Sequence, residues 1–362
     1  MLRKLDWYIL KKFFTTFIFA ILLLTFITVI IDVSEKADDF VKSGLSASQI
    51  IMEYYIGFIP HIVSMLFPLF VFISVVFFTS KMAGRSEIVA ILASGISFNR
   101  FLRPYAVGAI IMAILLWLSY RYVTPNANKL RSEFQIKYID GKGGGGSGSS
   151  TIYFRNDSTH FGQISYFDTA SKRGSGFVFQ EIKNSLVKNT RAEVITYIPE
   201  KDIYKIEDVL VRTIDSATNK ERLVKLDSQL IKLNFKPSEF KKDRYTKDIL
   251  TTPELVDLID KETTRGAEGL NEFKVEKYHR DSTPFSLLIL TLIGVSLASR
   301  KVRGGSGLHI AIGILLAALF ILTDRFASIF STKGNFPPAL AAWTPNIIFA
   351  FVAIYLFKKA PK

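Results

Sequence analysis

The chain contains no cysteine and only four histidines, at positions 61, 160, 279 and 309. Without thiols it can form neither a disulfide framework nor a thiolate metal site, and the histidines stand too far apart in the sequence to suggest zinc. No Gly-x-x-x-x-Gly-Lys-Ser/Thr motif occurs, and the glycine run at 143–146 lacks the lysine of a phosphate-binding loop. We therefore expect a chain that binds no metal or cofactor of its own and does not hydrolyse ATP.

A catalytic constellation is also missing from the sequence. Ser286 and Ser296 lie in an apolar run without a histidine and an aspartate placed to activate them, so we interpret them as helix-packing residues. We interpret His61 and His309 as packed or interfacial side chains rather than proton carriers. A membrane-bound hydrolase would need a nucleophile and a base that the sequence does not offer.

Apolar residues, by contrast, are abundant. Of the 362 residues 49% are hydrophobic and 31 are phenylalanine, and the mean hydropathy is +0.26. The formal net charge of +14 would suggest nucleic-acid binding in a soluble protein. Here, however, many lysines and arginines stand directly beside apolar runs, where such residues set membrane topology. The composition therefore predicts a membrane protein with a sizeable polar region and no nucleic-acid partner.

Six apolar runs are long enough to cross a bilayer. The second run is interrupted by Pro60 and by Phe67-Pro68, where lost backbone hydrogen bonds predict a bend, and a kinked helix commonly lines a cavity. No small-residue cleavage site follows the first run, so we expect it to be retained as an anchor. The predicted spans are residues 13–31, 54–80, 104–120, 282–299, 304–323 and 334–357.

The basic residues that flank these runs support the count of six. Fourteen of them fall on one side of the membrane when the spans alternate, and the positive-inside rule makes that side cytoplasmic, together with both termini. The other side, periplasmic in a Gram-negative bacterium, receives the turn at 32–42, the polar region between the third and fourth spans, and the loop at 324–333. The fourteen basic residues are those at 3, 4, 11, 12, 81, 85, 100, 103, 300, 301, 303, 358, 359 and 362.

The polar region at 125–275 is predicted to be a separate domain. Its Gly/Ser stretch at 143–150 is a flexible linker by composition, typical of an engineered loop replacement, with a natural glycine loop as the alternative. Alternation of apolar and polar residues after it, beginning with Ile152 and Phe154, predicts several short strands and a β-sandwich or jelly roll. We thus expect a membrane α-helical bundle of six transmembrane helices with an inserted periplasmic β-jellyroll domain, divided into residues 1–124, 125–275 and 276–362.

A short helix with polar ends is predicted at 86–94, between the second and third spans. Ser86 is a good N-cap, Glu87 places a negative charge at the positive end of the helix dipole, and Gly95 sits where a left-handed residue ends a helix. Its length of about 13 Å cannot cross about 30 Å of hydrocarbon, so it must lie along the membrane surface or in a partner's groove. A plain interfacial helix that joins two spans is the alternative.

Taken together, these motifs resemble the LptF/LptG family of permeases, which belong to the ABC transporter for lipopolysaccharide export, over essentially the whole chain. The most specific segment is Arg85-Ser86-Glu87 through Ala93-Ser94-Gly95, followed by the double proline Pro337-Pro338. The opening Leu-Asp-x-Tyr-Ile favours the LptG branch over the LptF branch. The other matching segments are Leu5-Asp6-Trp7-Tyr8-Ile9, Phe14-Thr15-Thr16, Pro60, Phe67-Pro68, Arg303-Gly304-Gly305 and the residues from Ala339 to Asn346.

The resemblance implies a heterodimer of two such permeases above an LptB ATPase dimer, which would bind ATP and Mg. Lipopolysaccharide would enter the central cavity from the outer leaflet of the inner membrane and pass through the jellyroll toward LptC and the periplasmic Lpt bridge. The helix at 86–94 would be the coupling helix in an LptB groove, with Glu87 as its principal charged contact. The implied coupling residues are Arg85, Ser86, Glu87, Ile88, Ile91, Ala93, Ser94 and Gly95.

Moving an amphipathic lipid requires an apolar and aromatic cavity with a charged rim. LptG-type members tend to carry basic residues where the first span leaves the membrane, whereas this end is mixed in charge, so a phosphate clamp is not carried over. A lipid A with fewer phosphates, a divalent-cation bridge, and basic residues from the partner permease all stay open. For Asp324-Arg325 we favour a snorkelling interfacial pair over a lipid contact. The lipid-cavity candidates are Phe26, Asp32, Lys36, Lys42, Pro60, Phe67, Pro68, Asp324 and Arg325.

One alternative function belongs to another class. A non-transporting membrane scaffold or mechanotransmission protein could use the same outer domain to recruit periplasmic partners. Bound proteins and lipid identified after co-purification would separate the two.

Overall fold

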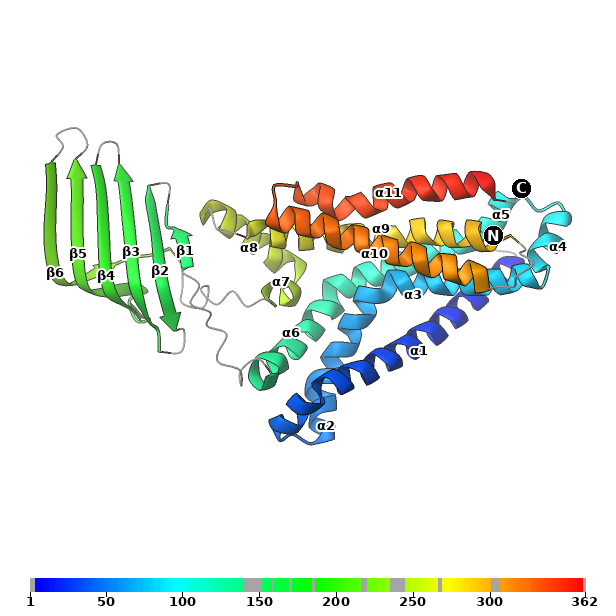
Figure 1. The fold of residues 1–362 in the computed structure, drawn as a ribbon, viewed down its shortest axis with the longest axis horizontal. Helices are drawn as coiled ribbons and strands as arrows, with labels where there is room; N and C mark the ends of the chain where they lie inside the picture. Colours follow the sequence, from blue (N-terminus) through cyan, green and yellow to red (C-terminus); the bar gives the residue numbers. More distant parts are fainter. Residues whose placement is uncertain are drawn as a thin grey trace. The chain divides into compact units, whose positions relative to one another are not determined.

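The computed structural model describes residues 4–139, 152–157, 159–168, 171–183, 186–215, 220–234, 245–265, 269–300 and 307–360. The chain divides into two compact units (Figure 1). A helical unit comprises Met1–Ile139, Lys247–Pro253 and Asn271–Lys362, and a β-rich unit comprises Asp140–Thr246 and Glu254–Leu270. The Gly/Ser stretch at 143–150 lies outside the described residues.

Six helical segments of the described chain are long and apolar enough to cross a membrane, which confirms the predicted number. The segments extend beyond the apolar runs, because polar helix formers such as Glu35 and Lys36 continue the first of them. The first segment is α1 (Lys4–Ser43). The second, Ala47–Gly84, consists of α2 (Ala47–Ile50), the π-helical turn η1 (Ile51–Tyr55) and α3 (Ile56–Gly84), and the third, Phe98–Ile139, consists of α5 (Phe98–Leu118), η2 (Ser119–Val123), α6 (Thr124–Phe134) and η3 (Gln135–Ile139). The last three are α9 (Leu270–Ala298), α10 (Gly307–Lys333) and α11 (Pro338–Lys359).

Aromatic side chains fill the core of the helical unit. The rings of Phe78 on α3 and Tyr105 on α5 stack with centroids 5.3 Å apart. Phe13 on α1 lies against Gly108 on α5, where an added Cβ would come within 2.4 Å of the phenyl ring. A glycine is therefore required at this helix crossing, because any side chain would push α1 away from α5.

The start of α1 and the end of α11 lie at one end of the helical unit, next to α4 (Glu87–Ala93) (Figure 1). Phe98 at the start of α5 packs against Phe357 of α11, with ring centroids 6.1 Å apart. Ile9, Ile88 and Ala360 are buried in the same core cluster. The start of α1, the helix α4 and the end of α11 thus form one packed region.

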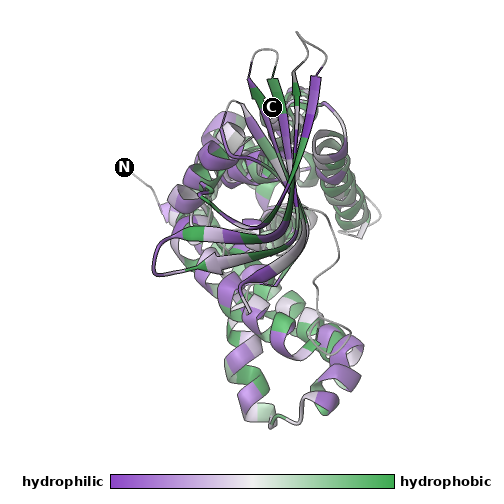
Figure 2. Cartoon of the chain, turned by 90° about the vertical axis from the view of Figure 1, so that its left-hand side faces the viewer, coloured by the Kyte–Doolittle hydropathy of each residue, from purple (hydrophilic) through white to green (hydrophobic). Residues whose placement is uncertain are grey.

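The β-rich unit contains a single twisted antiparallel sheet in the order β1-β2-β3-β4-β5-β6 (Figures 1 and 2). The prediction of a helical membrane bundle with an inserted β domain is confirmed. Within the described residues the strands form one open meander rather than two facing sheets, because each strand pairs with its neighbour in sequence. The strands are β1 (Ile152–Arg155), β2 (His160–Asp168), β3 (Arg173–Lys183), β4 (Leu186–Ile198), β5 (Ile203–Asp215) and β6 (Lys220–Ile231).

One face of this sheet carries a hydrophobic cluster. Phe177, Ile195, Tyr204 and Ile206 are fully buried in it. Purple and green residues both occur along the strands in Figure 2, as the alternation of polar and apolar residues in the sequence predicts. The unit also includes most of the amphipathic helix α8 (Thr252–Arg265).

Candidate functional site

The helix α4 is anchored through one apolar residue. Ile88 is 1% exposed and belongs to the main core of the helical unit, whereas Val89 beside it is 52% exposed. Gly95 has φ +85°, as predicted for the residue that ends the helix. Ser86 occupies the predicted N-cap position, but the predicted capping geometry is wrong: its backbone is left-handed with φ 61° and its side chain makes no capping hydrogen bond. The tight connection from α3 imposes this conformation, since the Ser86 N–H is bound to the carbonyl of Ala83.

The Glu87 carboxylate contacts the first helix of the chain. The Tyr8 hydroxyl donates a hydrogen bond of 2.8 Å to its Oε2 atom, and Lys12 Nζ lies 3.3 Å from the same atom. Arg85 is a weaker neighbour, with Nη1 4.0 Å from Oε1. The Glu87 side chain is 25% exposed, so the carboxylate is held by α1 and stays partly accessible to solvent.

A second charged contact joins α1 to the start of α5. Arg100 donates from Nη1 and Nη2 to the two carboxylate oxygens of Asp6, each at 2.7 Å. Asp6 is 1% exposed. Sequence reasoning missed this pair, although Asp6 is the single acid among the basic residues at the start of the chain. A bidentate arginine–carboxylate contact fixes orientation as well as distance.

At the other end of α1, two of the lipid-cavity candidates bind each other. Lys36 Nζ lies 2.5 Å from Asp32 Oδ1 and also contacts the Tyr54 hydroxyl. Tyr55 donates to Asp32 Oδ2 at 3.0 Å. Asp32 is 6% exposed, so this cluster ties α1 to η1. The i,i+4 spacing of an acid and a lysine could have indicated the pair from sequence.

The remaining candidates on α1 and α3 are placed differently. Phe26 is 65% exposed, and Lys42 is exposed in the last turn of α1. Phe67 packs against Phe17 with ring centroids 5.1 Å apart. Pro60 and Pro68 both lie inside α3, and Pro68 is buried.

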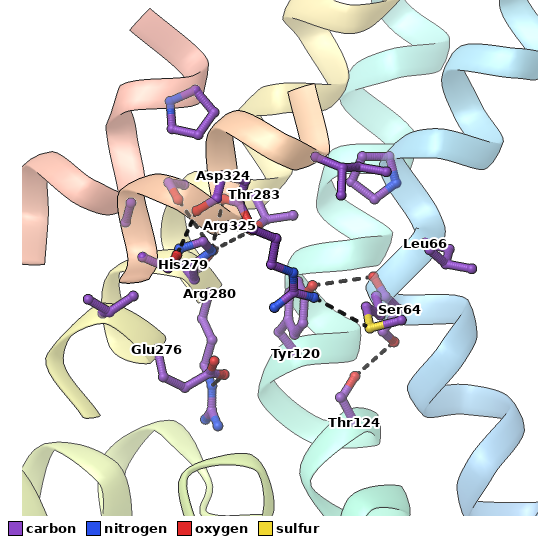
Figure 3. A pocket seen from close by; sticks show the side chains of 18 of the residues that line it. Ser64, Leu66, Tyr120, Thr124, Glu276, His279, Arg280, Thr283, Asp324 and Arg325 are labelled. Carbon is purple, nitrogen blue, oxygen red and sulfur yellow. Dashed lines mark hydrogen bonds and ion pairs between the residues drawn. The ribbon is translucent and has the colours of Figure 1, made fainter. Parts of the chain in front are cut away.

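A cavity of about 520 Å³ opens within the helical unit. Of the sequence candidates, Pro68, Asp324 and Arg325 line it. In Figure 3, Arg325 extends from α10 toward Ser64 of α3 and Tyr120 of η2. The wall combines apolar and charged side chains. The apolar ones include Leu66, Leu69, Leu290, Phe320 and Ile321, and the charged ones are Arg131, Lys247, Asp248, Glu272, Glu276, Arg280, Asp324 and Arg325.

Arg280 on α9 organises one wall of the cavity. It is 4% exposed, and its Nε donates to Glu276 Oε1 at 2.9 Å. Its two terminal nitrogens donate to the backbone carbonyls of Leu250 at 2.8 Å and of Lys247 at 2.9 Å. The short helix α7 (Thr246–Ile249) and the residues after it are thereby fastened to α9. Lys247 and Leu250 precede Arg280 by 33 and 30 residues, so no local sequence pattern predicts these contacts.

Asp324 and Arg325 do not form a simple pair with each other. Asp324 Oδ1 lies 3.5 Å from His279 Nδ1 of α9. The Arg325 guanidinium is exposed and reaches Met65 Sδ at 3.9 Å (Figure 3). Among the residues that the structure describes, no carboxylate lies within ion-pair distance of the Arg325 guanidinium, which lines the cavity.

Burial changes the titration of the α7 segment, which lies outside the membrane-spanning helices. Desolvation and then the neighbouring charge of Glu276 raise the pKa of Asp248 to about 6, against an opposing effect of Lys247, Arg131 and Arg280. Burial tends to lower the pKa of Lys247, but the bond to Glu272 at 2.6 Å reverses this and raises it. The carboxyl group of Asp248 is thus partly protonated just below neutral pH.

We expect the Asp248→Asn variant to differ from the parent in its pH dependence of stability. Folding raises the pKa of Asp248 from 3.8 to about 6. The stability that its protonated carboxyl contributes is therefore fully present below about pH 4 and is lost as the pH rises through 6. The variant should therefore be more stable than the parent at pH 8, by up to about 3 kcal/mol, and equal to it at pH 4. Thermal unfolding in detergent across this range measures the difference.

The exposed acid Asp281 supplies the control for this measurement. An Asp281→Asn variant makes the same replacement at an exposed position and so measures the general effect of exchanging a carboxyl group for an amide. Equal pH profiles for Asp248→Asn and the parent would contradict the prediction, because a normal titration of Asp248 would then be indicated.

No group of histidine and acidic residues suited to a metal ion occurs within the described ranges. The described site is thus made of ion pairs, hydroxyls and apolar walls. Such an arrangement can bind an amphipathic molecule and can transmit movement between helices.

Comparison with known proteins identifies relatives along the whole length of the chain. The sequence model described as "Lipopolysaccharide export system permease LptF/LptG" matches residues 7–359. The chain is 21% identical over 366 residues to the lipopolysaccharide export system permease protein LptG of Escherichia coli strain K12, and the match covers 98% of both chains. The same protein of Escherichia coli O6:H1 (strain CFT073) matches with the same identity and coverage.

Proposed function

Because the chain belongs to the LptF/LptG family of lipopolysaccharide export system permeases, we propose that it is the membrane subunit of an ATP-driven transporter powered by a separate ATPase. The observation that carries this proposal is the family match over residues 7–359, together with six spanning helices and an inserted β unit. As a multi-pass inner-membrane permease, the protein is a transport subunit rather than a catalytic enzyme. Its proposed partners are a second LptF/LptG-type permease, an LptB-type ATPase dimer that holds ATP and Mg, and LptC with the periplasmic bridge.

The proposed topology places α4 and both termini in the cytoplasm and the β-rich unit in the periplasm. The supporting observation is the charge at the end of the helical unit that contains α4. Lys12 and Arg100 contact acids there, and Lys358 and Lys359 end α11 in the same region. Lysine and arginine at one end of a bundle favour its cytoplasmic orientation.

We assign the coupling role to α4 and the residues beside it. Ile88 anchors the helix in the permease core, whereas the exposed Val89 and the partly exposed Glu87 are open to an ATPase groove. A short amphipathic helix that lies in a partner's groove can transmit movement without crossing the membrane. The assigned residues are Arg85, Ser86, Glu87, Ile88, Ile91, Ala93, Ser94 and Gly95.

The proposed lipid path runs along α1 and α10. In the most apolar stretch of α1 only 11% of the residues are buried, and in that of α10 only 17%. The corresponding value for the segment Ala47–Gly84 is 67%. Their exposed faces would complete a cavity with the second permease, with Phe26 on its wall and Lys42, Asp324 and Arg325 near its rim. Asp32 and Lys36 neutralise each other, so we assign them a role in holding α1.

Photocrosslinking from Phe26 tests the proposed transport function. A photoreactive amino acid at this position should crosslink lipopolysaccharide during ATP-driven transport in vesicles, whereas one at Phe351 of α11 serves as the control. Both side chains are highly exposed, at 65% and 70%. Equal crosslinking from the two positions would favour the non-transporting scaffold, because Phe26 would then simply face the bilayer.

A further inference from the structure

The helix α1 is buried in its first half and again around Asp32 and Phe40, and is less buried between them. Its 40 residues form one continuous helix with a length of about 60 Å. No residue between Ala20 and Asp32 is buried in this fully described helix. By contrast, α3 is packed along most of its length, with seventeen buried residues from Gly57 to Ala83. A helix with few buried contacts can be displaced at lower free-energy cost than one with many.

At the end near α4, four polar side chains attach α1. The Asp6–Arg100 pair holds it to α5 through two bonds of 2.7 Å. Tyr8 and Lys12 hold the Glu87 carboxylate of α4 at 2.8 and 3.3 Å. We call Asp6, Tyr8, Lys12 and Arg100 the latch. Because Tyr8 and Lys12 lie one turn apart on α1, both bonds to Glu87 come from the same face of the helix.

At the far end, α1 is held by the buried cluster around Asp32. Lys36, Tyr54 and Tyr55 surround this carboxylate, and Phe40 packs edge-on against Tyr54 with ring centroids 5.6 Å apart. The helix therefore connects a contact at α4 with a contact at η1. Its middle is only partly buried: Ile21, Leu24 and Val29 pack against the neighbouring core, whereas Phe26 is exposed.

We propose that the latch passes a displacement of α4 to α1, and that α1 carries it as a rigid rod to the Asp32 cluster on the opposite side of the bundle. This inference rests on the proposed function, because it takes α4 as the element that the ATPase moves. It assigns Asp6, Tyr8, Lys12 and Arg100 as positioning residues that act through Glu87 and α1 without touching lipid or nucleotide.

Two variants weaken the latch in different ways. Asp6→Asn removes one charge of a buried pair, and Tyr8→Phe removes only a hydroxyl, so it keeps the packing even where Asp6→Asn reduces folding. In the full chain, assembled with its partner permease and ATPase in vesicles, each should lower the lipid released per ATP hydrolysed by about three- to tenfold, with the ATPase rate within about twofold of the parent. The double variant Asp6→Arg, Arg100→Asp should recover at least about half of the parental ratio. Lys11→Gln, which removes an exposed charge from the same helix, is the control.

A distance measurement between spin labels reports the displacement of α1 directly. Because the chain has no cysteine, spin labels can be placed at Val41→Cys at the far end of α1 and at Tyr122→Cys in η2, two positions that are 81% and 63% exposed. The distance between the labels should change when ATP is added, and this change should shrink by at least about half in the Asp6→Asn or Tyr8→Phe background.

The inference and the proposed function fail in different ways. Full transport per ATP in both Asp6→Asn and Tyr8→Phe, with an unaltered distance change, would overturn the latch while leaving α4 as the coupling helix. Full transport in Glu87→Ala would overturn the coupling role of α4 itself. Loss of release that the charge-swapped pair cannot rescue, together with an unaltered distance change, would also count against the latch.

Discussion

Replacing Glu87 by alanine is expected to lower ATP-driven lipopolysaccharide release by at least about tenfold, because truncating one partner of a charged interface contact costs about 2 kcal/mol or more. The carboxylate is 25% exposed at the start of α4, where it can meet a basic group of the ATPase. The variant also frees Tyr8 and Lys12 from α4. Release from reconstituted vesicles, divided by ATP hydrolysed, is the quantity to measure.

Two companion variants sharpen the Glu87 experiment. Glu87→Gln keeps an oxygen that can accept from Tyr8 but removes the charge, so it separates loss of the Tyr8 hydrogen bond from loss of the charge that meets Lys12 and the ATPase. Glu133→Ala on α6 removes an exposed acid from the opposite end of the helical unit (Figure 1) and should transport normally. Parental release per ATP in Glu87→Ala would remove α4 from the coupling mechanism.

Replacing Arg280 by methionine is expected to destabilise the helical unit by about 3–5 kcal/mol, which is typical when one partner of a buried ion pair is removed. The change strips Glu276 of its partner and leaves the carbonyls of Lys247 and Leu250 without their donor. Amide hydrogen exchange in residues 247–253 should accelerate strongly, and the thermal midpoint in detergent should fall by several degrees.

Arg325→Met is the matched control for Arg280. It removes the same functional group from a side chain that lines the same cavity, but this guanidinium is exposed and contacts only Met65 among the hydrogen-bond partners in the described chain. We expect a change within about 0.5 kcal/mol. Equal destabilisation by the two variants would show that the carbonyl bonds of Arg280 do not hold the α7 segment.

Local sequence patterns were sufficient wherever a local physical cause operates. Long apolar runs require a bilayer or a core, so the six spans could be predicted without a structure. The alternating pattern from residue 152 onward likewise predicted a β domain, because side chains on a strand alternate between its two faces. At Gly95 the absence of a Cβ was enough to indicate a left-handed backbone.

Contacts between distant segments had no such signal. Serine is a favoured residue type at an N-cap, but Ser86 adopts φ 61°, because the short connection between α3 and α4 determines its backbone conformation. Asp6 and Arg100 are ninety-four residues apart and meet only through the packing of α1 on α5. In the same way, Arg280 finds its partners only after α7 folds back onto α9.

The sequence by itself determined the class of the protein, its number of spans and the β insertion, because hydrophobicity and periodicity act within a segment. Only the tertiary structure decided which charged side chains form ion pairs and which do not. Lys36 is neutralised by Asp32, whereas Arg325 faces a cavity without a carboxylate partner among the described residues. The electrostatic role of an ionisable side chain depends on what lies within a few ångströms of it, and in a helical bundle those neighbours come from other helices.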